Sequence, residues 1–316
     1  MEYLILVISL LAITFGANRF VDGAEGIARR LKISDFVIGA VVVGFGTSFP
    51  ELLVSLKGAI SGNADVAIGN VVGSNIFNVL GILGVTAMLF PIPTSRENIR
   101  RDAPFCFAVS MLLVLLAFNF FTGGETVISR IDGVLLLAVF ALFLWISLRQ
   151  GNQASSSDED TKPYNGKPLW HSALVAIVGL VVLILGCNFF VEQAVIIARN
   201  FGVSDAYISI TLIACGTSLP ELAASIAAAL KKNTQMALGN VIGSNIFNIT
   251  FILGTSSLIR PLYSPDIVVT DYLVMAGAAL LLMIFATTKV KISRWEGAFM
   301  FAAFVAYNIW LFSMQG

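Results

Sequence analysis

A six-residue phrase occurs twice in this chain and limits what the chain can fold into more than any other feature. Residues 46–51 read Gly-Thr-Ser-Phe-Pro-Glu, and residues 216–221 read Gly-Thr-Ser-Leu-Pro-Glu. Each phrase lies inside an apolar stretch and brings a carboxylate, two hydroxyls, a glycine and a proline with it. Proline cannot donate a backbone hydrogen bond and clashes with the preceding helical turn, while glycine loosens the backbone. Both phrases therefore predict a break in a helix.

The composition places these breaks in a membrane protein. Hydrophobic residues make up 57% of the 316-residue chain, charged residues 12%, and the mean hydropathy is +0.89. This balance is too apolar for an ordinary soluble domain. An ionisable group inside a membrane costs about 3 kcal/mol or more and is a functional-site candidate, and broken backbone there must line a protein-enclosed or wet cavity. The net charge of zero gives no electrostatic reason to expect a nucleic-acid partner.

Apolar stretches long enough to cross a bilayer occur in two sets of five. The polar stretch between the sets, residues 150–168, is predicted to be a cytoplasmic linker. Residues 1–149 would then form a first five-helix repeat and residues 169–316 a second, giving an all-α membrane protein of ten transmembrane helices. The predicted spans lie near residues 3–28, 35–60, 65–92, 103–121, 127–149, 169–197, 206–230, 235–260, 268–287 and 295–313.

The two sets are copies of one another at a constant offset of 170 positions. Residues 73–78 and residues 243–248 both read Gly-Ser-Asn-Ile-Phe-Asn, and no insertion interrupts the match. Because each copy has an odd number of spans, the second must enter the membrane from the opposite side. The charges agree, since lysine and arginine concentrate in the connections that are inside if both termini are outside. Inverted repeats are a transporter architecture with the substrate site near mid-membrane.

Polar side chains spaced by four residues form one stripe on each of four apolar helices. Turned inward, the stripes would line a cavity of carboxylate, hydroxyl, amide and backbone oxygens, which suits a hard cation such as Ca²⁺. Glu51 and Glu221 have no lysine or arginine in the stripes to pair with, so they favour a divalent cation, monovalent cations or protons in competition. The stripes are Thr47, Glu51 and Ser55; Asn70, Ser74 and Asn78; Thr217, Glu221 and Ser225; and Asn240, Ser244 and Asn248.

Helix packing is the alternative interpretation of these polar residues, since small and polar side chains mediate packing in membranes. Packing accounts well for Asn75 and Asn245, but it does not account for two mid-membrane glutamates next to prolines. Both interpretations stay open for the residues one turn from each break, namely Ser55, Asn70, Ser225 and Asn240.

The doubled motifs G-T-S-[FL]-P-E and G-N-x-x-G-S-N-I-F-N resemble the alpha repeats of the cation/calcium exchanger superfamily, and most of all its prokaryotic sodium/calcium exchanger-like members. The resemblance covers both halves, essentially the whole chain. It implies a ten-span antiporter of the cell (inner) membrane that exchanges Ca²⁺ for Na⁺, or in some branches for H⁺, without a further cofactor. Two of the implied ligand positions would contribute backbone carbonyls, Gly44 and Ala214. The implied metal ligands are Gly44, Thr47, Ser48, Glu51, Ser74, Asn78, Ala214, Thr217, Ser218, Glu221, Ser244 and Asn248.

Two departures from the family pattern narrow this expectation. Several relatives, notably the branch that also moves K⁺, carry an aspartate where this chain has Asn248, which argues against K⁺ co-transport. The linker is also too short for the calcium-sensing insert of the larger animal exchangers. The oligomeric state stays open.

Three other functions compete with Na⁺/Ca²⁺ exchange as interpretations of the sequence. A Ca²⁺/H⁺ antiporter is not cleanly separated by sequence, although hydroxyl-rich sites without a third carboxylate favour Na⁺. A cation channel is conceivable because acidic rings and carbonyls also build selectivity filters. An intramembrane hydrolase is disfavoured because no histidine or cysteine accompanies Ser48 or Ser218, so we do not expect an enzyme.

Overall fold

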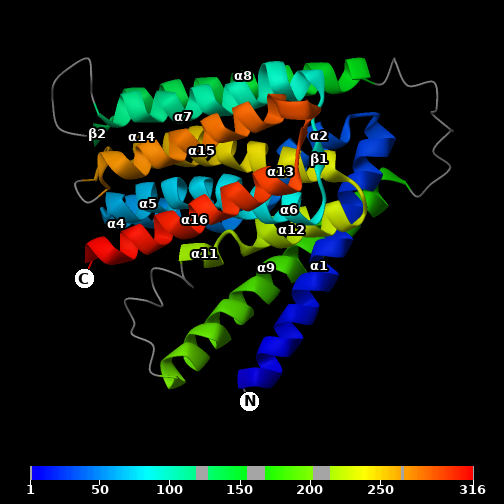
Figure 1. Cartoon of the computed structure of the whole chain (residues 1–316), viewed down its shortest axis with the longest axis horizontal. Coiled ribbons are helices and arrows are strands. Elements are labelled where there is room, and N and C mark those ends of the chain that lie inside the picture. The colour runs from blue at the N-terminus through cyan, green and yellow to red at the C-terminus, as the bar shows by residue number, and fades with distance from the viewer. Residues whose placement is uncertain (1, 119–126, 155–167, 202–213, 265–266, 316) are drawn as a thin grey trace. The chain divides into compact units, whose positions relative to one another are not determined.

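A computed structural model describes residues 2–118, 127–154, 168–201, 214–264 and 267–315 of the chain (Figure 1). These residues fold almost entirely into helices, with four two-residue strands. The strands form two antiparallel pairs: β1 (Ile92–Pro93) with β4 (Lys291–Ile292), and β2 (Val127–Ile128) with β3 (Leu262–Tyr263).

The helices include several short segments, because breaks and π-helical turns interrupt the longer ones. In the first half the helical segments are α1 (Glu2–Leu31), α2 (Asp35–Ile38), η1 (Gly39–Val43), α3 (Gly44–Thr47), α4 (Phe49–Ser61), α5 (Ala64–Ile76), η2 (Phe77–Leu83), α6 (Gly84–Leu89), η3 (Asn98–Asp102), α7 (Ala103–Ala117) and α8 (Arg130–Ala154). In the second half they are α9 (Leu169–Asn200), α11 (Ala214–Gly216), α12 (Leu219–Leu230), α13 (Thr234–Phe247), η5 (Asn248–Ile252), α14 (Leu253–Ile259), α15 (Val269–Thr287), η6 (Thr288–Val290) and α16 (Arg294–Gln315).

Seven of the described helices are long and apolar enough to cross a membrane, and the bent pair Asp35–Thr47 and Phe49–Ser61 makes eight. Eight of the predicted spans are therefore confirmed as helices. The other two predictions, near 103–121 and 206–230, include residues 119–121 and 206–213, which lie outside the described residues. The protein is an all-helical, multi-span membrane protein, and the count of ten stays a prediction.

Both predicted helix breaks are present. In the first phrase α3 ends at Thr47, α4 begins at Phe49, and the chain bends by 48° between them. In the second phrase α11 ends at Gly216 and α12 begins at Leu219, with a two-residue turn between the helices. The break therefore falls at Ser48 in the first copy and at Thr217 and Ser218 in the second, and in each copy one residue separates it from the proline.

The chain divides into two compact units, and each combines a stretch from the first half with one from the second. Unit 1 consists of Met1–Pro50 and Leu144–Asn240, and unit 2 of Glu51–Phe143 and Val241–Gly316. The predicted linker overlaps the end of α8, which continues to Ala154, and residues 155–167 lie outside the described residues.

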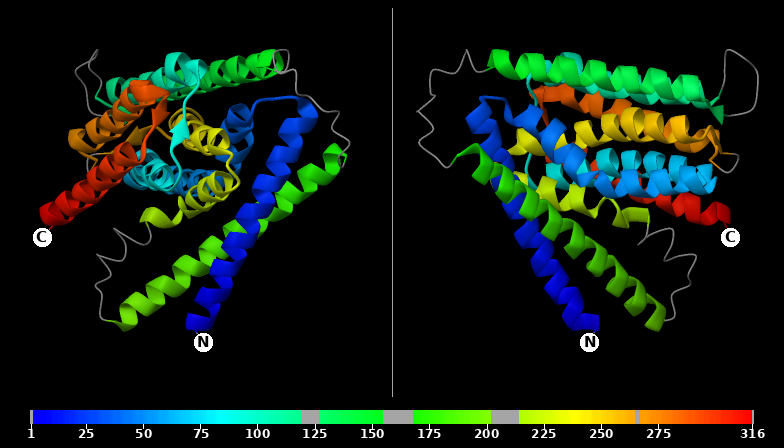
Figure 2. Two further views of the ribbon diagram at one scale, coloured as in Figure 1. Left: turned by 45° about the vertical axis from the view of Figure 1, so that its right-hand side comes forward. Right: turned by 180° about the vertical axis from the view of Figure 1, so that it is seen from behind.

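In unit 1, α1 and α9 lie side by side and contact each other through small residues (Figure 2). A Cβ atom added at Gly16 would lie 2.5 Å from the backbone nitrogen of Leu183, and one at Gly186 would lie 3.0 Å from that of Ile13. Gly23 lies equally close to the backbone of Ala176. Close backbone approach through glycine is a recurrent way for membrane helices to associate. The glycines of α1 and α9 therefore hold these two helices together.

The two helices that carry the asparagine stripes are among the most buried of the candidate spans. Within its apolar window, Thr234–Ile259 is 94% buried and Ala64–Leu89 is 78% buried, whereas α16 is 11% buried. Protein therefore covers the polar stripes, as broken or polar segments at membrane depth require.

Candidate cation-binding site

In unit 1 the carboxylate of Glu221 lies at the second break. Its side chain is fully buried in the first turn of α12, and Ser48 Oγ donates a hydrogen bond of 2.8 Å to its Oε1. Ser48 lies between the end of α3 and the start of α4, so the bend between these two helices sets the position of its hydroxyl beside Glu221. The second carboxylate oxygen, Glu221 Oε2, is buried and has no hydrogen-bond partner in the described part of the chain.

Asn240 holds the backbone around Glu221. Its Nδ2 donates to the main-chain oxygen of Glu221 at 3.2 Å and to Ser225 Oγ at 2.8 Å. Its Oδ1 accepts from Thr47 Oγ1 at 3.3 Å. One buried amide therefore ties α13 to α12 and to α3.

In unit 2 the same pattern surrounds Glu51. Its side chain is fully buried in α4, and Ser74 Oγ lies 3.5 Å from its Oε1. Asn70 Nδ2 donates to the main-chain oxygen of Glu51 at 3.1 Å and to Ser55 Oγ at 2.9 Å. These contacts repeat those of Asn240 at the offset of 170, so the amide has the same local role in both copies.

The residues one turn from each break thus act in packing and positioning. Ser55 and Asn70 hydrogen-bond to each other between α4 and α5, and Ser225 and Asn240 do so between α12 and α13. Of the two interpretations that the sequence leaves open for these residues, their contacts favour helix packing beside the glutamates.

Asn78 and Asn248 lie in π-helical segments, η2 and η5. Both side chains are fully buried. Asn78 Nδ2 donates to Asn245 Oδ1 at 3.0 Å, and Asn248 Nδ2 donates to Asn75 Oδ1 at 3.1 Å. Among the described residues neither Asn78 Oδ1 nor Asn248 Oδ1 has a hydrogen-bond partner. Single π-helical turns are frequent at functional sites. No pattern of residues in the sequence predicts these two.

The buried oxygens without a hydrogen-bond partner indicate what kind of ligand these residues can bind. Leaving a buried acceptor unsatisfied costs about 1–3 kcal/mol, and more when the acceptor is charged. Glu221 Oε2 in unit 1, and Asn78 Oδ1 and Asn248 Oδ1 in unit 2, are acceptors of this kind, and coordination of cations would satisfy them. Carboxylate and amide oxygens are ligands of hard cations such as Ca²⁺. The residues therefore fit a cation.

The other predicted ligands take up varied positions. Ser218 and Ser244 are fully buried, whereas Thr217 is half-buried. The carbonyl of Gly44 accepts from Ser48 N at 3.1 Å, and Thr47 Oγ1 lies 3.4 Å from the same oxygen. Ala214 is the first residue of α11. Of the predicted set, Gly44, Thr47, Ser48 and Glu221 come together in unit 1, and Glu51 and Ser74 do so in unit 2.

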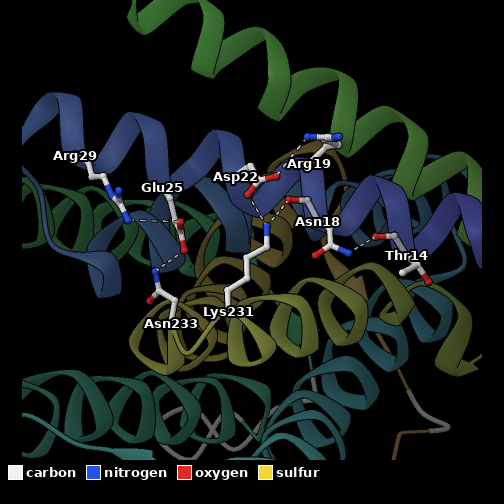
Figure 3. Close-up of polar contacts among 8 residues, drawn as sticks. All are labelled: Thr14, Asn18, Arg19, Asp22, Glu25, Arg29, Lys231 and Asn233. Carbon is white, nitrogen blue, oxygen red and sulfur yellow. Dashed lines mark hydrogen bonds and ion pairs between the residues drawn. The ribbon is translucent and has the colours of Figure 1, made fainter. Parts of the chain in front are cut away.

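A second polar cluster of unit 1 lies at the surface, where the turn after α12 meets α1 (Figure 3). Lys231 Nζ forms an ion pair of 2.6 Å with Asp22 and donates to the main-chain oxygen of Asn18 at 2.7 Å. Asn233 Nδ2 donates to Glu25 at 3.1 Å. In the sequence, the lysines and arginines indicate only the side of the membrane, and no spacing pattern predicts that Lys231 pairs with residues of α1.

The family follows from comparison with known proteins. The family model described as "Sodium/calcium exchanger protein" matches residues 1–149 and 171–313. The chain belongs to the sodium/calcium exchanger family. Among the relatives of this exchanger, the "Putative antiporter CaxA" of Alkalimonas amylolytica is 39% identical over 98% of both chains. The "Sodium/calcium exchanger MaX1" of Methanosarcina acetivorans is 33% identical, also over 98% of both.

A solved structure supports the same assignment. The sodium-calcium exchanger NCX_Mj, soaked with Na⁺ and Ca²⁺, superposes on this exchanger with a TM-score of 0.82 at 33% identity, covering 96% of each chain. The protein therefore has the fold of that exchanger. It is a cation exchanger and not an enzyme.

Proposed function

We propose that this exchanger moves Ca²⁺ across the membrane in one direction and Na⁺ in the other. The observation that carries the proposal is the presence of buried carboxylate and amide oxygens without a hydrogen-bond partner in the described residues, at Glu221, Asn78 and Asn248. The names of its relatives support it: MaX1 is called a sodium/calcium exchanger, and NCX_Mj was soaked with both ions.

In this proposal Glu51 and Glu221 supply the two fixed negative charges, which one Ca²⁺ or two Na⁺ neutralise. Hydroxyl, amide and backbone oxygens complete the coordination without adding charge, so both ions compete for the same ligands. The proposed ligands are Gly44, Thr47, Ser48, Glu51, Ser74, Asn78, Ala214, Thr217, Ser218, Glu221, Ser244 and Asn248. With asparagine at 248, K⁺ is not among the transported ions.

Coupling follows from the cost of moving unneutralised charge. An empty site with two buried carboxylates resists the change of access, because desolvating them is costly, whereas a loaded site does not. We propose that α1 and α9 move together when access alternates, and the close glycine contacts between them support treating the two helices as one moving pair.

The proposed architecture has ten spans in two inverted halves, residues 1–149 and 169–316, joined by a cytoplasmic linker at 150–168. Both termini would lie outside the cell (inner) membrane. The seven described helices long enough to span, together with the bent pair, support the count, and the contacts repeated at an offset of 170 support the duplication. The distribution of lysine and arginine supports the orientation.

The decisive test of the transported ions is Ca²⁺ uptake into proteoliposomes with Na⁺, K⁺ and pH gradients imposed in turn. We expect an outward Na⁺ gradient alone to drive uptake. Uptake driven by a pH gradient alone would make the protein a Ca²⁺/H⁺ antiporter. Uptake that needs no counter-ion would make it a channel.

The charge requirement is tested by Glu51→Gln and Glu221→Gln, which keep the shape of the side chain and remove its charge. Each should reduce Na⁺-driven Ca²⁺ uptake by about 100-fold or more, because the site then lacks half of its fixed charge. Glu25→Gln, in the surface cluster of α1, is the matched control and should keep most of the activity. Wild-type uptake in either site variant would refute its ligand role.

A further inference from the structure

The asparagines at 75 and 245 do more than join helices. We propose that Asn75 and Asn245 are positioning residues, which fix the side-chain amides of Asn248 and Asn78 so that the Oδ1 atoms are presented to the transported cation. This inference rests on the function proposed above. It concerns residues of unit 2 alone.

The arrangement begins at two main-chain carbonyls. Asn245 Nδ2 donates to the main-chain oxygen of Asn75, and Asn75 Nδ2 donates to that of Asn245, both at 3.3 Å. A carbonyl oxygen can only accept, so it selects the NH₂ group of each amide. The Oδ1 atoms of Asn75 and Asn245 must therefore point to the other side.

Those two Oδ1 atoms in turn select the orientation of the next amides. Asn245 Oδ1 can only accept, and it accepts from Asn78 Nδ2 at 3.0 Å. Asn75 Oδ1 likewise accepts from Asn248 Nδ2 at 3.1 Å. Asn78 and Asn248 are left with their Oδ1 atoms on the opposite side, and within the described chain neither atom has a hydrogen-bond partner.

Burial makes this selection effective. Asn75 and Asn245 are 1% and 2% exposed, and the two amides that they orient are fully buried, so water does not compete for these groups. An amide turned the other way would offer N–H groups, which repel a cation. A carboxylate would need no such selection, because both of its oxygens accept. The orientation imposed by Asn75 and Asn245 therefore matters because residues 78 and 248 are asparagines.

The competing explanation is that Asn75 and Asn245 only pack α5 against α13. A substitution that removes them would weaken either role, so loss of function alone decides nothing. The two explanations differ when the oriented residue is changed to aspartate. Orientation then ceases to matter, whereas packing between α5 and α13 still does.

The test measures Ca²⁺ binding by isothermal titration calorimetry on the purified, detergent-solubilised full chain. Asn75→Leu keeps the branched shape of the side chain and removes the acceptor, and we expect it to weaken Ca²⁺ binding by about 10- to 100-fold, as loss of an outer-shell partner does. In a background carrying Asn248→Asp, the same Asn75→Leu change should alter the Kd by less than about twofold relative to Asn248→Asp alone. Equal losses in both backgrounds, or no loss without Asn248→Asp, would overturn the proposal.

The second copy supplies an independent arm, Asn245→Leu with and without Asn78→Asp, for which the same two results are expected. If leucine at position 75 prevents a monodisperse preparation, Asn75→Ala removes the same acceptor with less bulk and is judged by the same comparison. The readout needs no counter-ion. A wild-type chain that does not bind Ca²⁺ would overturn the proposed function, whereas wild-type binding with equal losses in both backgrounds would overturn only the positioning role.

Discussion

The turn at residues 61–63 and the turn at residues 231–233 share a backbone and differ in chemistry. The middle residue of each has a positive φ, 79° at Gly62 and 63° at Lys232. The third residue, an asparagine in both, returns its N–H to the preceding helix at 2.8 Å and 2.9 Å. Its side chain then accepts from the N–H three residues later, which starts the next helix.

The two turns differ in the side chains of their first two residues, and the difference in contacts lies in the first. Ser61 Oγ donates within its own helix, to the carbonyl of Gly58, whereas Lys231 contacts Asp22 and Asn18 on α1. The asparagine cap and the left-handed backbone are therefore common to both copies, whereas the charge differs between them. Charge is also the property that reports the side of the membrane.

The largest expected effect tests whether the two turns lie on opposite sides. Single cysteines introduced by Ser61→Cys and Lys231→Cys, in a chain whose native Cys106, Cys187 and Cys215 are replaced by alanine, should react with a membrane-impermeant maleimide from opposite faces. In right-side-out vesicles we expect labelling at position 61 and almost none at position 231. Inside-out vesicles should reverse the result.

Labelling of both positions from the same face would contradict the inverted arrangement and would leave the charge difference without a topological cause. Permeabilised vesicles are the control, because both positions must then react. Ser61 is exposed and Lys231 is half-exposed, so burial does not protect either position.

The next effect tests whether the copies are equivalent beside the glutamates. Asn70→Ala and Asn240→Ala each remove an amide that donates to a glutamate carbonyl and to a serine. Outer-shell partners of this kind are worth about 10- to 100-fold in cation affinity, and we expect similar rises in the KM for Ca²⁺ uptake. Asn240 also accepts from Thr47 Oγ1, so its substitution should have the larger effect. A rise in only one variant would show that the copies differ in function.

Much of this structure can be predicted from the sequence, and the features that cannot be predicted share a physical reason. Proline and glycine act on the local backbone, so the helix breaks at residues 46–51 and 216–221 can be predicted from the sequence alone. The partners of Asn75 lie 170 or more positions away, and which end of an amide faces which neighbour depends on contacts that spacing does not encode. The π-helical turns at Asn78 and Asn248 likewise depend on tertiary packing, so a four-residue spacing predicts a regular helix there.

A smaller effect is expected where the copies differ in charge. Lys231→Ser introduces the residue found in the other copy and removes the ion pair to Asp22. The side chain of Lys231 is 24% exposed and that of Asp22 is 46% exposed. Exposed ion pairs contribute about 0.2–1 kcal/mol, so Ca²⁺ uptake rates should change by no more than about fivefold. If the ion pair contributes to transport, the effects of Lys231→Ser and Asp22→Asn on the uptake rate will be non-additive in a double-mutant cycle. Additive changes would mean that this contact does not couple α1 to the turn.

The smallest effect concerns the left-handed residue itself. Lysine in this conformation costs about 1–2 kcal/mol, and glycine relieves that strain at an entropic cost of about 0.5–1 kcal/mol, so Lys232→Gly should stabilise the protein slightly. We expect the thermal unfolding midpoint in detergent to rise by about 1–3 °C. The reverse change in the other turn, Gly62→Ala, should lower it by more, because the added Cβ also meets the guanidinium of Arg260. If Lys232→Gly lowered the midpoint, the lysine side chain would be making a stabilising contact, and the middle residues of the two turns would also differ in their contacts.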